Sequence, residues 1–183
     1  EGLDLLEISG GTYEQPKMMM ADKVTMDEAK AINMRASTIA REAYFLDYAR
    51  DIRAATKLPL LVTGGFRSVE GMNAALQSGA TDAIGLGRPL CYDTDLPKRL
   101  LDGTSSEAPR IEDELALGSG RLLGQSSPFK MVRLINGMGA ANWFMYQLLR
   151  MGRGQEPDMK LGVFGAFRKL QGEDRKAGAA LKR

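Results

Sequence analysis

The sequence predicts an α/β protein built around a small parallel sheet. Three short apolar runs, residues 3–9, 58–63 and 82–86, each end at glycines. Near-continuous apolar runs of this length are typical of parallel strands whose two faces are covered by helices. Each run leads through a polar loop into a segment with helical spacing. The repeated order of strand, glycine turn and helix therefore indicates the α/β class.

Helical spacing accounts for the segments between the strands. Residues 37–56 carry apolar side chains three or four positions apart, which predicts an amphipathic helix after an extended loop over residues 12–35. Ser68 is placed to cap the next helix, which is expected to end near Ser78. Gly79 then supplies the left-handed residue that commonly ends a helix.

A change in composition predicts a domain boundary after Gly103. A short helix is expected over residues 95–102, and the segment that follows, 104–109, has the composition of a linker. We therefore assign residues 1–103 to the α/β part and residues 104–183 to a linker and a helical C-terminal extension.

The extension contains one strongly apolar segment, residues 131–151, which includes Trp143 and Phe144. Charged and amide side chains interrupt it, so a docked helix or helical hairpin is favoured over a membrane span. The last dozen residues, 172–183, are charged or small, and we expect them to be frayed.

The composition excludes several classes of function. The 183 residues carry 25 Lys and Arg against 23 Asp and Glu, a net charge of +2, which is too balanced for a chain that binds nucleic acid over its whole surface. The absence of histidine removes Ser-His and Cys-His nucleophile pairs and every histidine-containing zinc site, and no metal site is expected. The single cysteine, Cys91, excludes an internal disulfide framework. Without a signal peptide or a long apolar run, we expect a cytoplasmic protein with no membrane partner.

Two glycine turns form a matched pair 23 positions apart. The first holds Gly64 and Gly65, and the second holds Gly87 followed by Arg88. Glycine allows the backbone to approach an anion closely with its N–H groups, and the arginine fork suits phosphate oxygens. The alternative is that the glycines only form tight strand-to-helix turns, and the residues alone favour neither interpretation.

Four motifs, in order along the chain, resemble one known family. They are residues 5–14 (LLEISGGTYE), 41–46 (REAYFL), 62–68 (VTGGFRS) and 82–90 (DAIGLGRPL). Together they resemble the C-terminal end of the old yellow enzyme family, the NADH:flavin oxidoreductases. The resemblance runs from about residue 2 to residue 103.

The resemblance implies an FMN-dependent TIM (β/α)8 barrel, of which this chain would hold about strands 6–8 and a helical C-terminal tail. It implies FMN as cofactor, NAD(P)H as reductant, and an activated alkene or similar small molecule as acceptor. It places the FMN phosphate beside Gly64, Gly65, Phe66 and Arg67, with Gly87 and Arg88 completing the cradle. The family's substrate-binding histidine pair and tyrosine proton donor have no counterpart here. The catalytic residues therefore stay unassigned, and little or no activity is expected of the chain alone.

Two other functions remain open at this point. The chain is alternatively a non-catalytic half-barrel that associates with a partner or with itself through unpaired sheet edges. It is alternatively a different phosphate-binding barrel enzyme, with its substrate rather than FMN in the cradle.

Overall fold

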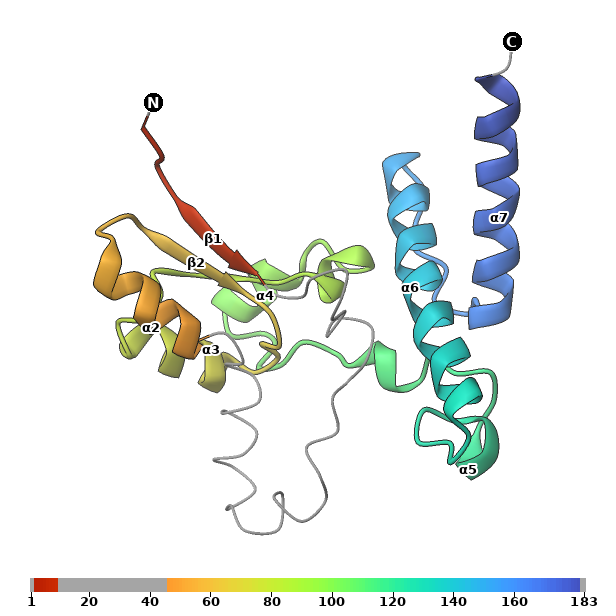
Figure 1. The fold of residues 1–183 in the computed structure, drawn as a ribbon, viewed down its shortest axis with the longest axis horizontal. Coiled ribbons are helices and arrows are strands. Elements are labelled where there is room, and N and C mark those ends of the chain that lie inside the picture. The colour runs from red at the N-terminus through yellow and green to blue at the C-terminus, as the bar shows by residue number, and fades with distance from the viewer. Residues whose placement is uncertain (1, 10–45, 182–183) are drawn as a thin grey trace. The chain divides into compact units, whose positions relative to one another are not determined.

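The computed structural model describes residues 2–9 and 46–181, which divide into two compact units (Figure 1). The first unit runs to Leu90 and includes Thr94–Pro109. The second unit consists of Cys91–Asp93 and the chain from Arg110 onward. The loop predicted over residues 12–35 and the beginning of the helix after it lie outside the described residues.

The first unit contains a parallel sheet of three strands. The strands are β1 (Leu6–Ser9), β2 (Leu60–Thr63) and β3 (Ala83–Gly85), and β2 lies between the other two. All three fall within the apolar runs of the sequence, so the predicted α/β class and the parallel sheet are confirmed. That the sheet is part of a barrel stays a prediction.

Among residues 2–9 and 46–109, three α-helices accompany the sheet. They are α2 (Leu46–Ala55), which contacts β2, α3 (Val69–Gln77), which contacts β3, and α4 (Leu96–Leu101). The strands and helices share one apolar core, in which four alanines leave room for the larger side chains. Its buried members are Ile8, Leu46, Ala49, Leu60, Val62, Phe66, Met72, Ala75, Ala80, Leu96, Leu100 and Ala108.

The predicted helix ends are confirmed. The Ser68 side-chain oxygen accepts a hydrogen bond of 3.0 Å from the Gly71 amide, which satisfies one of the free N–H groups at the start of α3. Gly79 and Gly103 follow α3 and α4 with φ angles of +71° and +78°. Both lie in the left-handed region that ordinary side chains rarely adopt.

The first compact unit ends at Pro109, six residues beyond the predicted boundary at 103. The segment after α4 returns to the start of α3. The Val69 amide donates to the Ser106 carbonyl at 2.9 Å, and the Ala108 amide donates to the Arg67 carbonyl at 2.7 Å. These long-range backbone bonds hold a segment that has the composition of a linker.

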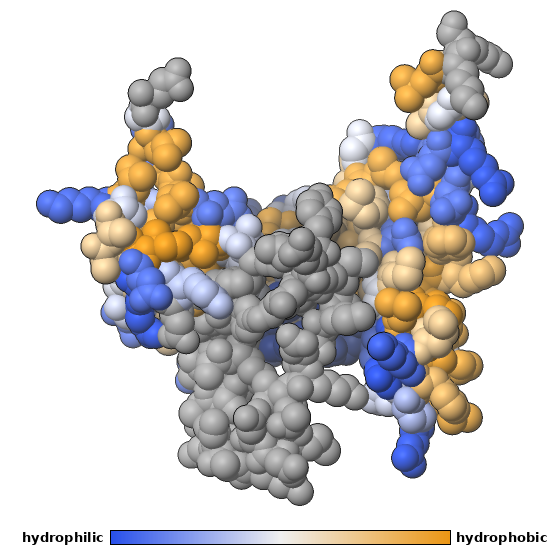
Figure 2. Space-filling view, in the orientation of Figure 1, coloured by the Kyte–Doolittle hydropathy of each residue, from blue (hydrophilic) through white to orange (hydrophobic). Residues whose placement is uncertain are grey.

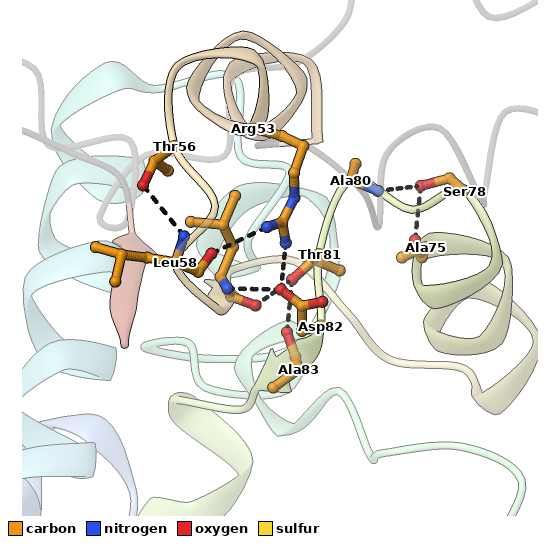
Figure 3. A network of polar contacts seen from close by, with 10 residues as sticks. Arg53, Thr56, Leu58, Ala75, Ser78, Ala80, Thr81, Asp82 and Ala83 are labelled. Carbon is orange, nitrogen blue, oxygen red and sulfur yellow. Dashed lines mark hydrogen bonds and ion pairs between the residues drawn. The ribbon is translucent and has the colours of Figure 1, made fainter. Parts of the chain in front are cut away.

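A polar network ties α2 to the starts of β2 and β3 (Figure 3). The Arg53 guanidinium pairs with the Asp82 carboxylate and donates to the Leu58 carbonyl at 2.9 Å. The Asp82 carboxylate also accepts from the Leu60 amide at 2.8 Å. The buried Thr81 hydroxyl lies 3.0 Å from the Leu60 carbonyl oxygen. The network lies at the amino ends of β2 and β3, away from the glycine turns that follow these strands.

This network makes the stability of the first unit sensitive to acid. The Leu60 amide and, after it, the Arg53 guanidinium hold the pKa of Asp82 below its usual range. A carboxyl whose pKa is lowered by folding stabilises the fold above its unfolded pKa, and this contribution is lost as the pH falls through the folded pKa. We expect the stabilisation to be full above about pH 5 and to decrease progressively as the pH falls below about 4.

Thermal unfolding of Asp82→Asn between pH 3 and pH 7 checks this expectation. The variant should have a lower Tm than the original chain at pH 7, and the difference should shrink toward pH 3. Asp51→Asn, at an exposed position on α2 in the same unit, is the matched control. It should change the Tm neither at pH 7 nor at pH 3. A difference in Tm that stays constant from pH 7 to pH 3 would contradict the assignment.

The second unit is a helical hairpin with a core of its own. Its helices are α5 (Gly120–Leu123), α6 (Lys130–Gly152) and α7 (Val163–Ala180), and α6 packs along α7. The indole N–H of the fully buried Trp143 donates to the Leu161 carbonyl at 2.7 Å. The other buried core residues are Tyr92, Leu115, Phe144, Val163 and Ala166.

The helix predicted over residues 131–151 is confirmed as α6, a single helix rather than a hairpin within that range. Over the described part of the chain, no helix combines the length and the apolar character needed to cross a membrane.

The prediction of a frayed C-terminal end is wrong, because α7 continues to Ala180. Alanine, lysine, arginine and glutamate dominate this end, and all four favour helices. In addition, Glu173 pairs with Arg153 from beyond the end of α6 and with Lys176 one turn further along α7. The pair with Arg153 ties the second half of α7 to the preceding segment.

Candidate functional site

The carboxyl ends of the three strands lie side by side. Ser9 of β1 is in register with Thr63 of β2, and Thr63 is in register with Gly85 of β3. The turns that follow β2 and β3 therefore leave the sheet at the same edge. In α/β proteins this edge is where ligand sites are found, because the loops after the strands converge there.

The turn after β2 begins with two glycines in conformations that other residues avoid. Gly64 has a φ angle of 142° and Gly65 one of 81°. Within the described residues, the Gly65 and Phe66 amides donate to no acceptor. Two consecutive amide groups in such a turn form a concave arrangement that suits an anion.

The turn after β3 leaves space above its backbone. A Cβ atom built on Gly87 would meet no atom of the described residues within 4 Å. The half-buried Arg88 follows and begins a short 3-10 helix, Arg88–Cys91, in which the Leu90 amide donates to the Gly87 carbonyl at 3.0 Å. An open backbone followed by an arginine is a combination that suits a phosphate group.

Phe66 and Arg67 have more restricted roles than the other predicted residues. The Phe66 ring lies in the core of the first unit with 1% exposure, so only its backbone faces the turn. Arg67 is also buried, and its Nη1 donates to the Phe66 carbonyl at 2.8 Å. The part of the cradle that can reach a ligand is therefore made by backbone amides and by Arg88. That these residues contact a phosphate stays a prediction.

The start of α3, next to the first turn, is already supplied with acceptors. The Val69 amide donates to the Ser106 carbonyl, and the Gly71 amide donates to the Ser68 side chain. Glu70 adds a negative charge in the first turn of the helix. An anion at this edge would therefore be held by the turn rather than by the amino end of α3.

Sequence reasoning missed a side-chain contact at this edge. The Thr63 hydroxyl donates to a Glu7 carboxylate oxygen at 2.7 Å, which links β1 to β2 beside the turns. A Cβ atom on Gly85 would lie only 1.7 Å from the Thr63 hydroxyl oxygen, so the next strand requires glycine here. Strand register could have found this contact, because Thr63 pairs with Ser9, two residues after Glu7, on one side and with Gly85 on the other.

The chemistry that the described turns offer is anion binding. Hydrogen bonds lower the pKa of three carboxyl groups in the described chain, but Asp82, Asp102 and Glu173 all lie outside the two turns. The motif residues after β1, including Tyr13 and Glu14, lie outside the described residues. The two turns therefore provide amides, space and one arginine, groups that are suited to binding an anion and not to transferring protons.

Comparison with known proteins identifies relatives of part of the chain. No family model matches it. The NADH-dependent flavin oxidoreductase iliE of Neonectria sp. is 38% identical over 115 residues, which cover 61% of this chain and 14% of that protein. The NADH-dependent flavin oxidoreductase iccE of Talaromyces variabilis is 43% identical over 101 residues, 55% of this chain and 23% of that protein. A Hypocrea jecorina protein, also named iliE, is 39% identical over the same shares.

The chain therefore spans less than a quarter of the length of each of these relatives. Their names specify a flavin and NADH, in agreement with the cofactor and the reductant that the sequence motifs imply. The resemblance seen in the sequence is confirmed: this chain is related to the NADH-dependent flavin oxidoreductases.

Proposed function

We propose that this chain provides the phosphate end of the FMN site in an NADH-dependent flavin oxidoreductase of the old yellow enzyme type. One observation carries the proposal. The two glycine turns follow adjacent parallel strands whose ends are in register, and the second turn combines open space at Gly87 with the cation of Arg88. The relatives named for flavin and NADH support the same function.

The residues of the chain have separate tasks in this proposal. The Gly65 and Phe66 amides bind phosphate oxygens from one side, while Gly87 and the Arg88 guanidinium complete the cradle. Gly64 shapes the turn, and Arg67 supports it from within the first unit. The bound flavin would carry a hydride from NADH to the acceptor, an activated alkene or a similar small molecule.

The proposed architecture is the last three strands of a TIM barrel followed by a helical tail. Such a barrel needs about 250 residues, and the ring of the flavin would contact strands other than these three. We therefore expect the 183-residue chain to bind FMN weakly and to oxidise NADH little or not at all. The proposed location is the cytoplasm, with neither nucleic acid nor membrane as a partner.

Replacement of Arg88 by alanine should weaken the binding of FMN about 10- to 100-fold, because a charged hydrogen bond to phosphate contributes about 1.5–3 kcal/mol. Titration of FMN with the chain, followed by flavin fluorescence, measures the effect. Arg88→Lys keeps the charge but loses the two-pronged geometry, so it should fall between alanine and arginine.

Riboflavin, which lacks the phosphate, separates phosphate binding from ring binding in the same titration. It should bind more weakly than FMN and should not distinguish the Arg88 variants. Arg168→Ala, at an exposed position on α7, is the control for removal of one arginine. Equal binding of riboflavin and FMN would contradict the cradle. A sugar phosphate that competes as well as FMN would favour a different phosphate-binding enzyme.

A further inference from the structure

Helix α6 buries one face in the hairpin, and its opposite face is exposed and largely apolar. The buried face includes Trp143 and Phe144, which pack in the core of the second unit. An exposed apolar stripe along a helix normally packs against another surface. The exposed apolar residues of α6 are Met131, Leu134, Ile135, Met138, Met145, Leu148 and Leu149, and none of the charged residues of α6 lies among them.

The exposed face follows the spacing of a coiled coil. Six positions, here called the seam, succeed one another at intervals of four, three, four, three and four residues. This is the alternation of a and d positions in a heptad repeat. The seam consists of Met131, Ile135, Met138, Asn142, Met145 and Leu149.

Asn142 is the one polar member of the seam, and it occupies an a position near the middle of α6. In parallel two-stranded coiled coils, a single asparagine at an a position fixes the register and the number of strands. Asn142 donates to the Met138 carbonyl at 2.8 Å, which leaves its side-chain oxygen and its second amide hydrogen available for a partner.

A groove runs beside the seam, between α6 and the first turns of α7. Its volume is about 280 Å³. Close packing of Gly139 against Val163 brings the two helices together at its floor, since a Cβ on Gly139 would lie 2.8 Å from the Val163 Cβ. The residues that line the groove are Leu117, Ile135, Met138, Gly139, Asn142, Val163, Phe164 and Phe167. Figure 2 shows apolar side chains over α6 and the first part of α7, with charged side chains further along α7.

We propose that the seam is a dimer interface, in which α6 of a second copy of this chain packs in parallel against α6 of the first. The exposed apolar residues of α6 together with Phe164 and Phe167 offer on the order of 800 Å² per copy, if about 200 Å² is taken for each fully exposed side chain. A stable dimer needs about this area from each partner. The flexible methionines at the d positions let the two seams adapt to one another.

The mass of the complete chain in solution, measured by light scattering during gel filtration at about 50 µM, tests the proposal. The original chain should be a dimer. Met138→Glu places a charge at the centre of the seam and should raise the dissociation constant on the order of 100-fold, which gives a monomer. Met159→Glu is the matched control, because Met159 is exposed to a similar extent (52% against 49%) but lies outside the seam. It should remain a dimer.

Trp143 fluorescence reports whether each variant keeps the core of the second unit, since this buried residue is the only tryptophan of the chain. An unchanged emission maximum in a monomeric Met138→Glu shows that the seam, rather than the fold, was lost. A monomeric original chain would overturn the proposal, and so would a dimer that persists in Met138→Glu or dissociates equally in Met159→Glu.

Disulfide trapping tests the parallel arrangement without relying on a disruptive variant. In a chain with Cys91→Ser and Met145→Cys, the two introduced cysteines occupy equivalent d positions and should meet across a parallel pair. Mild oxidation should then convert most of the protein to a covalent dimer. The control chain, with Cys91→Ser and Met159→Cys, should form little covalent dimer under the same oxidation. Equal amounts of covalent dimer from Met145→Cys and Met159→Cys, or no covalent dimer from Met145→Cys, would overturn the parallel arrangement of the two α6 helices. These experiments require no flavin, so they can fail while the proposed flavin site stands.

Discussion

Replacement of Trp143 by alanine is expected to destabilise the second unit by about 3–5 kcal/mol, which is a large part of the stability of an ordinary domain. The indole is fully buried between the aromatic rings of Tyr92 and Phe144, with ring centroids 6.0 and 5.3 Å away. Its truncation leaves a cavity and removes the donor to the Leu161 carbonyl. Both losses weaken the connection between α6 and the start of α7.

Urea unfolding followed by far-UV circular dichroism measures this loss. The urea concentration at the midpoint of unfolding of the second unit should fall by about 2 M. Trp143→Phe keeps an aromatic ring but removes the donor, so it should cost less than alanine. Tyr48→Ala, an exposed aromatic position on α2, serves as the surface control and should change the stability by no more than about 0.5 kcal/mol. An equally small effect at Trp143 would contradict the assigned core.

Gly85→Ala should destabilise the first unit by about 3 kcal/mol, at the upper end of the range for overpacking. The added Cβ would lie 1.7 Å from the Thr63 hydroxyl oxygen, 2.7 Å from its Cβ and 3.1 Å from its Cα. A change of rotamer at Thr63 relieves only the first of these contacts, because the other two atoms are fixed by the backbone of β2. The strands must then separate at the edge where the two turns meet.

Hydrogen exchange of the Val62 and Ile84 amides measures the effect in the first unit, since Trp143 reports only on the second. Gly87→Ala is the matched control two residues further along. Its Cβ meets no atom within 4 Å in the part of the chain that the structure describes, so the fold should be unchanged or slightly stabilised. If Gly87→Ala also weakens the binding of FMN, the space above this turn belongs to the ligand. If the Val62 and Ile84 amides exchange equally slowly in Gly85→Ala and Gly87→Ala, the close contact between β2 and β3 would be contradicted.

Local signals in the sequence predicted those parts of the fold that local physics decides. The Ser68 cap and the left-handed Gly79 depend only on neighbouring backbone groups, so their residue types sufficed. The three strands were recognisable because both faces of a parallel sheet are covered, which leaves continuous apolar runs. The apolar composition of residues 131–151 predicted a helical segment there but did not decide between one helix and a hairpin.

Contacts between distant segments decide the features that the sequence did not reveal. Arg153 and Glu173 are 20 positions apart, and their pairing ties the second half of α7 to the segment after α6. Thr63 and Glu7 are 56 positions apart and meet only through the strand register. The orientation of Phe66 was also hidden, because a turn has no periodicity from which a buried side chain can be recognised.

The most direct test of the flavin-phosphate site is nuclear magnetic resonance of the ¹⁵N-labelled chain during titration with FMN. Weak binding still moves amide signals, so the test does not require a complete barrel. The account predicts that the amides of Gly64, Gly65, Phe66, Gly87 and Arg88 shift with FMN and much less with riboflavin, while the Trp143 signals in the second unit stay in place. Amides at these five positions that do not respond to FMN, or that respond equally to riboflavin, would contradict it.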